Sequence, residues 1–308
     1  MPDTDVARDL FLHWFQHAYG HEPQLTESTD PTLIANVGGA HLALEVQPLI
    51  AAGPSEPWDS VRTDLESRIS ASVPGAIAVW TPLGAGLPAD EPASSEFVDE
   101  ISKTALKLGP RERSYARLPI ELYLRKNDES GGVVSVTGGL NAHWAKFTEH
   151  VTGSYDLDST SLHRLPESDE HLLELIEAII DLSKSLDVGQ VGSVPTFDAW
   201  TVQRTDDEGS ATLVGVPPSV AADSGPHLRR NLRKALAGSA PRLREAEADV
   251  RAIVLLAYYG RIEDEVVTTA MRGFDPALYS GLDIICLVAD GIVRPLIQAP
   301  IEALAARR

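Results

Sequence analysis

Two acidic residues, Asp30 and Glu45, have the side chains that hard metal cations prefer, and each lies at the end of an expected strand. Asp30 precedes the expected strand 32–37, and Glu45 is near the end of the expected strand 40–46. Glu45 and Gln47 point to the same side of that strand because side chains alternate. Carboxylates on adjacent strands can share Mg²⁺ or Mn²⁺, which polarises a phosphoryl oxygen and activates a bound water. The pair predicts a metal site for phosphate chemistry.

Short acidic pairs of this kind are also common without a metal. In that interpretation Asp30 is a turn residue before Pro31, and Glu45 is a solvent-facing residue of an amphipathic strand. The separation of the two carboxylates distinguishes the interpretations. Oxygens that share one cation lie about 4–5 Å apart, because ligand distances are about 2.0–2.6 Å.

The elements around the pair are expected to be one helix followed by three strands. Apolar residues recur at helical spacing from Val6 to Ala18, and Gly20 ends the pattern. A short extended segment follows around residues 23–28. Strands 32–37 and 40–46 then flank Gly38-Gly39, which is a hairpin signal.

The last third of the chain reads as helix, strand, helix, strand and strand. A basic helix over 226–236 resumes toward residue 246, and strands 250–257 and 282–289 are continuously apolar. A helix over 263–271 lies between these two strands. Continuous apolar strands joined by a helix are typical of a parallel pair in a sheet that is covered on both faces.

The middle of the chain, residues 51–220, reads as a separate α+β region. Its strongest helix begins after Ser168 and carries an apolar face. Two hairpins are expected here, because turn residues separate consecutive strands. One pairs strand 118–125 with 133–137, and the other pairs 197–204 with 212–216.

This order of elements, with Asp before one strand and Glu-x-Gln on the next, resembles the restriction-endonuclease-like superfamily, the PD-(D/E)xK nucleases. Asp30 matches the motif Asp and Glu45 the motif Glu, while Gln47 stands where the family has Lys. The resemblance implies a metal-dependent nuclease that hydrolyses phosphodiesters of DNA or RNA, in a prokaryotic defence or repair setting. Asp30 and Glu45 then hold Mg²⁺ or Mn²⁺, and Gln47 positions the attacking water without supplying positive charge.

The expected fold class is therefore α/β, with a restriction-endonuclease-like mixed sheet flanked by helices and a large α+β insertion. Residues 1–50 and 221–308 form the nuclease-like core, and residues 51–220 are an inserted or second region.

The segment from His227 to Arg244 is a basic helix that contains six Lys or Arg residues and no acid. Residues four apart form adjacent rows on a helix. In a chain this acidic, the cluster indicates a surface that contacts nucleic-acid phosphates through Arg229, Arg230 and Arg233, and Lys234 or Arg233 would also supply the charge of the lysine that the strand lacks. Alternatively these cations neutralise acidic surface of the same protein, or dock an acidic protein partner or a second subunit.

Composition limits the functions that the chain can have. The net charge is −19 from 26 Lys and Arg against 45 Asp and Glu, so the whole surface does not bind polyanions. One cysteine, Cys286, excludes an internal disulfide and a cysteine-based zinc site. The acidic N-terminus and the short apolar runs predict a cytoplasmic protein without a membrane segment. The acidity and Gln47 together favour a second hypothesis, a catalytically inactive nuclease-like protein that acts as a protein-interaction module.

Overall fold

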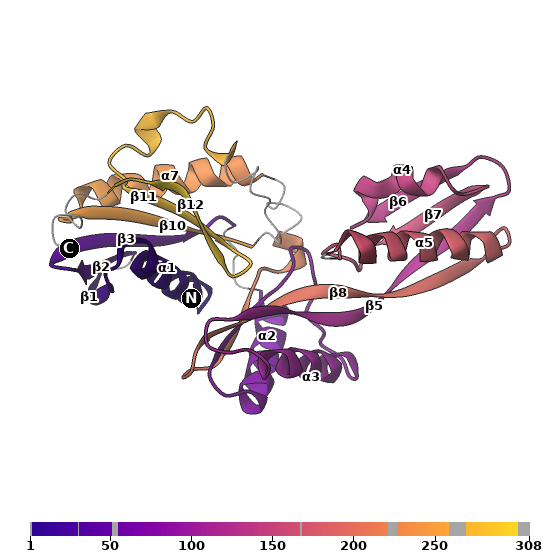
Figure 1. The fold of residues 1–308 in the computed structure, drawn as a ribbon, viewed down its shortest axis with the longest axis horizontal. Helices are drawn as coiled ribbons and strands as arrows, with labels where there is room; N and C mark the ends of the chain where they lie inside the picture. Colours follow the sequence, from indigo (N-terminus) through magenta and orange to yellow (C-terminus); the bar gives the residue numbers. More distant parts are fainter. Residues whose placement is uncertain are drawn as a thin grey trace. The chain divides into compact units, whose positions relative to one another are not determined.

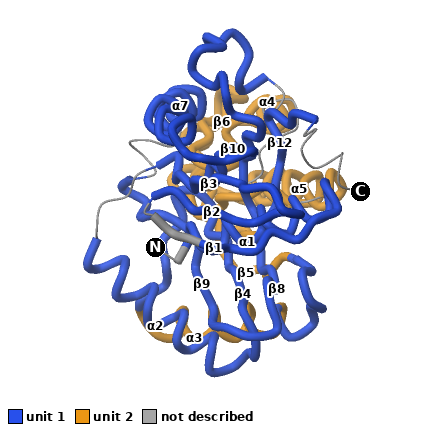
Figure 2. Tube along the Cα trace, turned by 90° about the vertical axis from the view of Figure 1, so that its left-hand side faces the viewer, with its two compact units in different colours: residues 1–89, 105–114, 201–308 blue, residues 90–104, 115–200 orange. Residues whose placement is uncertain are grey.

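The computed structural model describes residues 2–29, 31–50, 55–166, 168–220, 227–258 and 269–300 of the chain. Its contacts divide the chain into two compact units (Figure 2). Unit 1 comprises residues 1–89, 105–114 and 201–308, and unit 2 comprises residues 90–104 and 115–200. The boundaries predicted at residues 50 and 220 delimit a nuclease-like core rather than a compact unit. The division into two units does not test them, and they stay a prediction.

The first sheet lies in unit 1, and its strands in the described residues have the order β1-β2-β3-β10-β11-β12. Their bounds are β1 Gln24–Thr29, β2 Thr32–Val37, β3 Ala40–Pro48, β10 Val250–Ala257, β11 Ile284–Ala289 and β12 Ile292–Gln298. The strands β1, β2 and β3 form an antiparallel meander, and β10 is parallel to both β3 and β11. The strand β12 returns antiparallel to β11, which makes the sheet mixed.

Helices cover both faces of this sheet, as Figure 1 shows. They are α1 (Pro2–Tyr19) and α7 (Leu228–Glu245). Alternate residues of β10 serve the two faces, since Val254 belongs to the same core as Phe11 of α1 and Ile253 to the same core as Leu236 of α7. All four are fully buried, which explains why the central strands are apolar without alternation.

The second sheet has the strand order β6-β7-β5-β8-β4-β9. The bounds are β4 Ala76–Trp80, β5 Arg113–Asp128, β6 Val133–Gly138, β7 Ser154–Ser159, β8 Val191–Asp206 and β9 Ala211–Val214. The strand β4 is antiparallel to β8 and parallel to β9. The strands β4 and β9 and the last part of β8, from Thr201, belong to unit 1, whereas residues 191–200 of β8 belong to unit 2.

In unit 2 the helices cover one face of the sheet and leave the other face in solvent. Further helices in the described residues are α2 (Glu56–Ser72, in unit 1), α3 (Ala93–Ala105), α4 (Trp144–Thr148) and α5 (Asp169–Ser185), with 3₁₀ turns η1 (Asn141–His143) and η2 (Pro276–Leu278). Leu122, Leu124 and Val194 are buried in one core with Leu175 of α5. On the opposite face apolar side chains are exposed, among them Tyr123, Val133, Val191 and Phe197.

The structure corrects both hairpins expected in the middle region. The strand β6 does not pair with β5 but lies parallel to β7. The strand β9 does not pair with β8, because β4 lies between them and pairs with both. Turn residues report only that the chain reverses, and strands from elsewhere in the chain then separate the neighbours.

The two mixed sheets with their helices confirm the α/β class. The parallel pairing of β10 and β11 is confirmed too, while most of the helix expected at 263–271 lies outside the described residues. Within the described ranges, no helix combines the length and apolarity needed to cross a membrane.

Candidate functional site

Glu45 lies in the third strand of the unit 1 sheet and is fully buried. Its strand has a neighbour on each side, with Thr32 of β2 and Ile253 of β10 as the paired residues. Strand alternation directs Glu45 to the same face as Ala43, which belongs to the core under α7. The interpretation of Glu45 as a solvent-facing strand residue is therefore wrong.

Arg242 of α7 binds both carboxylate oxygens of Glu45. Its Nε donates to Oε1 at 3.0 Å and its Nη2 donates to Oε2 at 2.6 Å. These hydrogen bonds, together with the nearby charge, raise the pKa of Arg242 above that of a free guanidinium. Such a two-point ion pair is the strongest arrangement that an arginine and a carboxylate form.

The remaining acceptor positions of Glu45 are also used. The hydroxyl of Thr32 donates to Oε1 at 2.9 Å, and the side-chain amide of Gln47 lies 3.5 Å from Oε2. The Arg242 guanidinium is held in turn by the Gly238 carbonyl at 2.7 Å. A cation could bind Glu45 only by displacing these donors, so the residues around Glu45 do not fit Mg²⁺ or Mn²⁺ as they stand.

The other half of the predicted metal site, Asp30, lies outside the described residues. Gln47 is half-buried on the same strand as Glu45. Across the part of the chain that the structure describes, no group of three or more His, Cys, Asp or Glu side chains is arranged to hold a metal ion.

The first four cations of the basic helix divide into an inner set, Arg229 and Arg233, and an outer set, Arg230 and Lys234. Arg229 donates to the carbonyls of Thr269 and Ala270 at 2.9 and 3.1 Å, and its guanidinium stacks 5.0 Å from the ring centre of Phe274. Arg233 stacks on the same ring at 5.1 Å. Both thus contact their own protein through backbone carbonyls or an aromatic ring, and their expected role toward nucleic acid stays a prediction.

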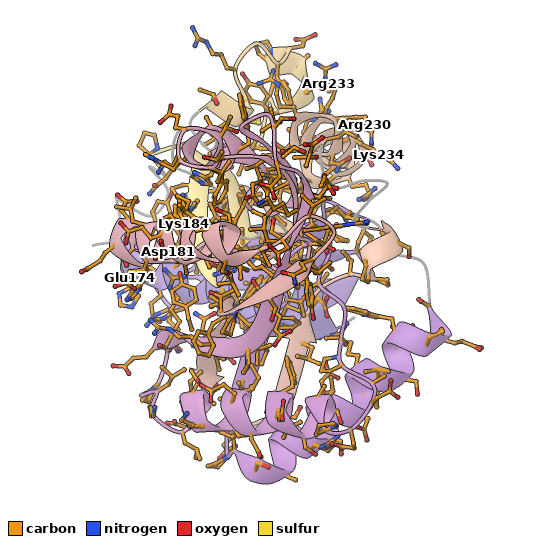
Figure 3. All side chains as sticks on the ribbon, turned by 90° about the vertical axis from the view of Figure 1, so that its right-hand side faces the viewer. Glu174, Asp181, Lys184, Arg230, Arg233 and Lys234 are labelled. Atoms are coloured by element: carbon orange, nitrogen blue, oxygen red, sulfur yellow. The ribbon has the colours of Figure 1, made fainter. Side chains whose placement is uncertain are left out.

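Arg230 and Lys234 form the outer set and are exposed at the surface of α7, where Figure 3 labels them. Lys234 lies eight residues before Arg242, which is about 12 Å along the helix axis. The structure thus places Arg242 at Glu45, rather than Lys234 or Arg233. Sequence reasoning included Arg242 in the basic segment but did not expect this contact, which depends on how α7 crosses β3.

A second buried carboxylate, Asp198 of β8, was not singled out from the sequence. It is 2% exposed and accepts hydrogen bonds from the backbone N–H groups of His163 and Arg164 at 3.0 and 2.9 Å. The Nδ1 atom of His163 lies 3.0 Å from Oδ2, and the indole N–H of Trp200 donates to the same oxygen at 3.1 Å. The signal in the sequence was weak, because the partners are two residues and about 35 residues away.

This histidine–carboxylate pair could orient an imidazole for proton transfer. In the described residues, however, no hydrogen bond joins His163 to a Ser, Thr or Cys side chain, so the pair lacks a nucleophile. The cluster fastens the loop at residues 163–164 to β8 instead.

Comparison of the chain with models of known protein families found no match, and searches of curated proteins and of solved structures found none either.

Proposed function

We propose that unit 1 contains a restriction-endonuclease-like core whose acidic site is closed, and that the protein works as an interaction module rather than a nuclease. The order α1, β1, β2, β3, α7, β10 supports the likeness, because it follows the order of elements in that superfamily. The meander of three strands joined in parallel to β10 supports it as well. Residues between β3 and α7 then form the insertion.

The observation that carries the proposal is the ion pair between Glu45 and Arg242. A motif carboxylate needs free oxygens to bind a cation, whereas both oxygens of Glu45 are occupied by Arg242, which binds in two places. Gln47 cannot replace the charge of the motif lysine. Breaking a buried ion pair between a carboxylate and an arginine that binds both of its oxygens is strongly unfavourable, unless another cation replaces the arginine.

A metal-dependent nuclease is the second candidate, and one feature favours it. Arg242 brings a positive charge to Glu45 from a helix, where the motif has a lysine on the strand. Arg230 and Lys234 are exposed on the same helix and could contact phosphates.

Plasmid nicking in Mg²⁺ or Mn²⁺ tests the proposal, with the parent compared to Glu45→Gln and Asp30→Asn. We expect no nicking by any of the three, and calorimetry should detect no Mg²⁺ binding that depends on either acid. Nicking by the parent that both variants lose, while circular dichroism shows that they remain folded, would establish the nuclease and overturn the interaction module.

A further inference from the structure

The strand β8 has a free edge in unit 2. The strand β4 pairs with β8 only over Ala76–Trp80, which is opposite Thr201–Asp206. The strand β4 ends at Trp80, and Pro82 follows two residues later. Among the described strands, none pairs with residues 191–200 of β8 on the side away from β5.

The backbone groups that face this edge follow from strand alternation. The N–H of Arg204 donates to Glu112 next to β5, and the carbonyl of Gln190 accepts from Lys126 of β5. Both positions are even-numbered, so the even-numbered residues between them also face β5. The N–H and C=O groups of Phe197 and Ala199 therefore point to the free side.

A pocket of about 380 Å³ lies along this edge, between β8 and α5. Figure 1 shows α5 running alongside β8. The pocket wall is largely apolar, and its apolar residues include Leu175, Ala178, Val194, Phe197 and Ala199. Phe197 is 53% exposed, so an aromatic surface is open beside the unpaired backbone groups.

Three ionisable side chains line the same pocket. Arg117 of β5 is exposed, and in the described residues no acidic side chain pairs with it. His171 and Glu174 lie on α5, where Figure 3 labels Glu174. The unpaired guanidinium beside an apolar wall is suited to a carboxylate that arrives with an apolar chain.

The edge strand is held in position before any partner arrives. Asp198 lies between Phe197 and Ala199, and three of its hydrogen bonds fix β8 to the loop at 163–164. A rigid edge loses little conformational entropy when a strand is added, and this favours binding.

From these features we infer that the groove between β8 and α5 binds an extended, acidic-apolar peptide segment of a partner protein as an added strand. The main chain pairs with Phe197 and Ala199, an apolar side chain lies against Phe197, and an acidic side chain pairs with Arg117. The inference rests on the proposed interaction function and names its partner.

A second copy of this chain fits the edge less well. Pro195 stands in the middle of the free segment and has no N–H to donate. Proline on an edge strand interrupts the long ladder that edge-to-edge pairing of two copies needs. Pro195 still leaves residues 197–199 able to pair with a short added strand.

The test uses a phage-displayed library of random linear peptides, selected on the full chain and then counter-selected on Phe197→Asp. Synthetic, fluorescein-labelled copies of the enriched peptides are the probes for anisotropy. We expect enriched peptides with an acidic residue among apolar ones, and at least tenfold weaker binding to Phe197→Asp. The matched control is Tyr123→Asp, since Tyr123 is an exposed aromatic residue on the bare sheet face that does not line the pocket, and this variant should bind as the parent does.

A charge exchange completes the test. Arg117→Glu should weaken binding of the acidic peptides, and replacing their acid by lysine should restore binding to this variant. Size-exclusion chromatography of the parent checks for a second copy as occupant. No enrichment, equal binding by Phe197→Asp and the parent, or self-association that Phe197→Asp abolishes would overturn the inference. A different result would refute the proposed function, namely plasmid nicking that depends on Glu45.

Discussion

The two sheets of this protein differ in the exposure of their polar groups, which are buried and paired in one and open to solvent in the other. In unit 1, helices cover both faces, and the acidic residue that could do chemistry is buried beneath α7 and held by Arg242. In unit 2 one face is bare, and β8 presents unpaired backbone groups and Phe197 beside a pocket. The motif carboxylate Glu45 thus lies where solutes have least access, and the surface that is open at β8 consists of backbone groups and apolar side chains.

This difference explains why a motif search and the structure direct attention to different places. A motif is recognised by residue types, and Asp30, Glu45 and Gln47 provide them. A free strand edge is defined by where the neighbouring strand stops, and β4 stops pairing with β8 at Trp80. The predictions below test whether Asp198 and the Glu45–Arg242 pair stabilise their units and whether the edge of β8 binds a partner.

Asp198→Asn should have the largest effect on stability. The carboxylate accepts four hydrogen bonds in a buried position, and an amide would turn its NH₂ group toward donors. We expect a loss of about 3 kcal/mol, since unsatisfied buried groups cost about 1–3 kcal/mol each. Urea unfolding followed by tryptophan fluorescence measures it. Asp181→Asn, on the exposed side of α5, is the control, and a similar loss in both would contradict the account.

Arg242→Ala should destabilise unit 1 by about 2 kcal/mol. It leaves Glu45 buried without its counterion, and the effect is below the usual cost of about 3–5 kcal/mol because Arg242 is 43% exposed and solvent can enter. The same urea titration measures the change. Lys234→Ala on the same helix should stay within about 0.5 kcal/mol of the parent. A neutral or stabilising Arg242→Ala would show that the ion pair does not hold the site closed.

A third buried carboxylate, Asp3 in unit 1, predicts a dependence on pH. Burial raises its pKa, although Arg62 and the Gly215 N–H partly offset this. On raising the pH above about 4, the unfolded chain releases the Asp3 proton first, so the parent loses stability relative to Asp3→Asn. The slope is at most about 1.4 kcal/mol per pH unit. Unfolding titrations across this range should show that sign, and a relative gain for the parent would refute it.

Pro195→Val should have the smallest effect. It adds one N–H to the free edge of β8, and one hydrogen bond contributes about 0.5–1.5 kcal/mol. Binding of the enriched peptides should tighten a few-fold, and the variant should self-associate more in sedimentation experiments. Weaker peptide binding would show that residue 195 does not face the free edge.

Much of the unit 1 fold could be predicted from the sequence because its signals are local. The helix from Val6, the strands around Gly38-Gly39, and the apolar strands β10 and β11 all follow from periodicity. The pairings in the second sheet could not be predicted, because β4 enters between β8 and β9 from more than a hundred residues away.

For the site, the sequence indicated Glu45 but not its state. Glu45 is buried because α7 covers the sheet face to which its side chain points. It is paired because α7 crosses the sheet so that Arg242, two turns beyond Lys234, reaches the carboxylate. Neither fact has a signature in the order of residues. The metal role of Asp30 stays a prediction.

The central claim is that β8 binds partners and that Glu45 takes no part. Anisotropy titration of one enriched peptide against Phe197→Asp and Glu45→Gln, side by side, tests it most directly. The account predicts that Phe197→Asp loses at least tenfold in affinity while Glu45→Gln binds as the parent does. Loss of binding in Glu45→Gln with none in Phe197→Asp, both folded, would contradict it.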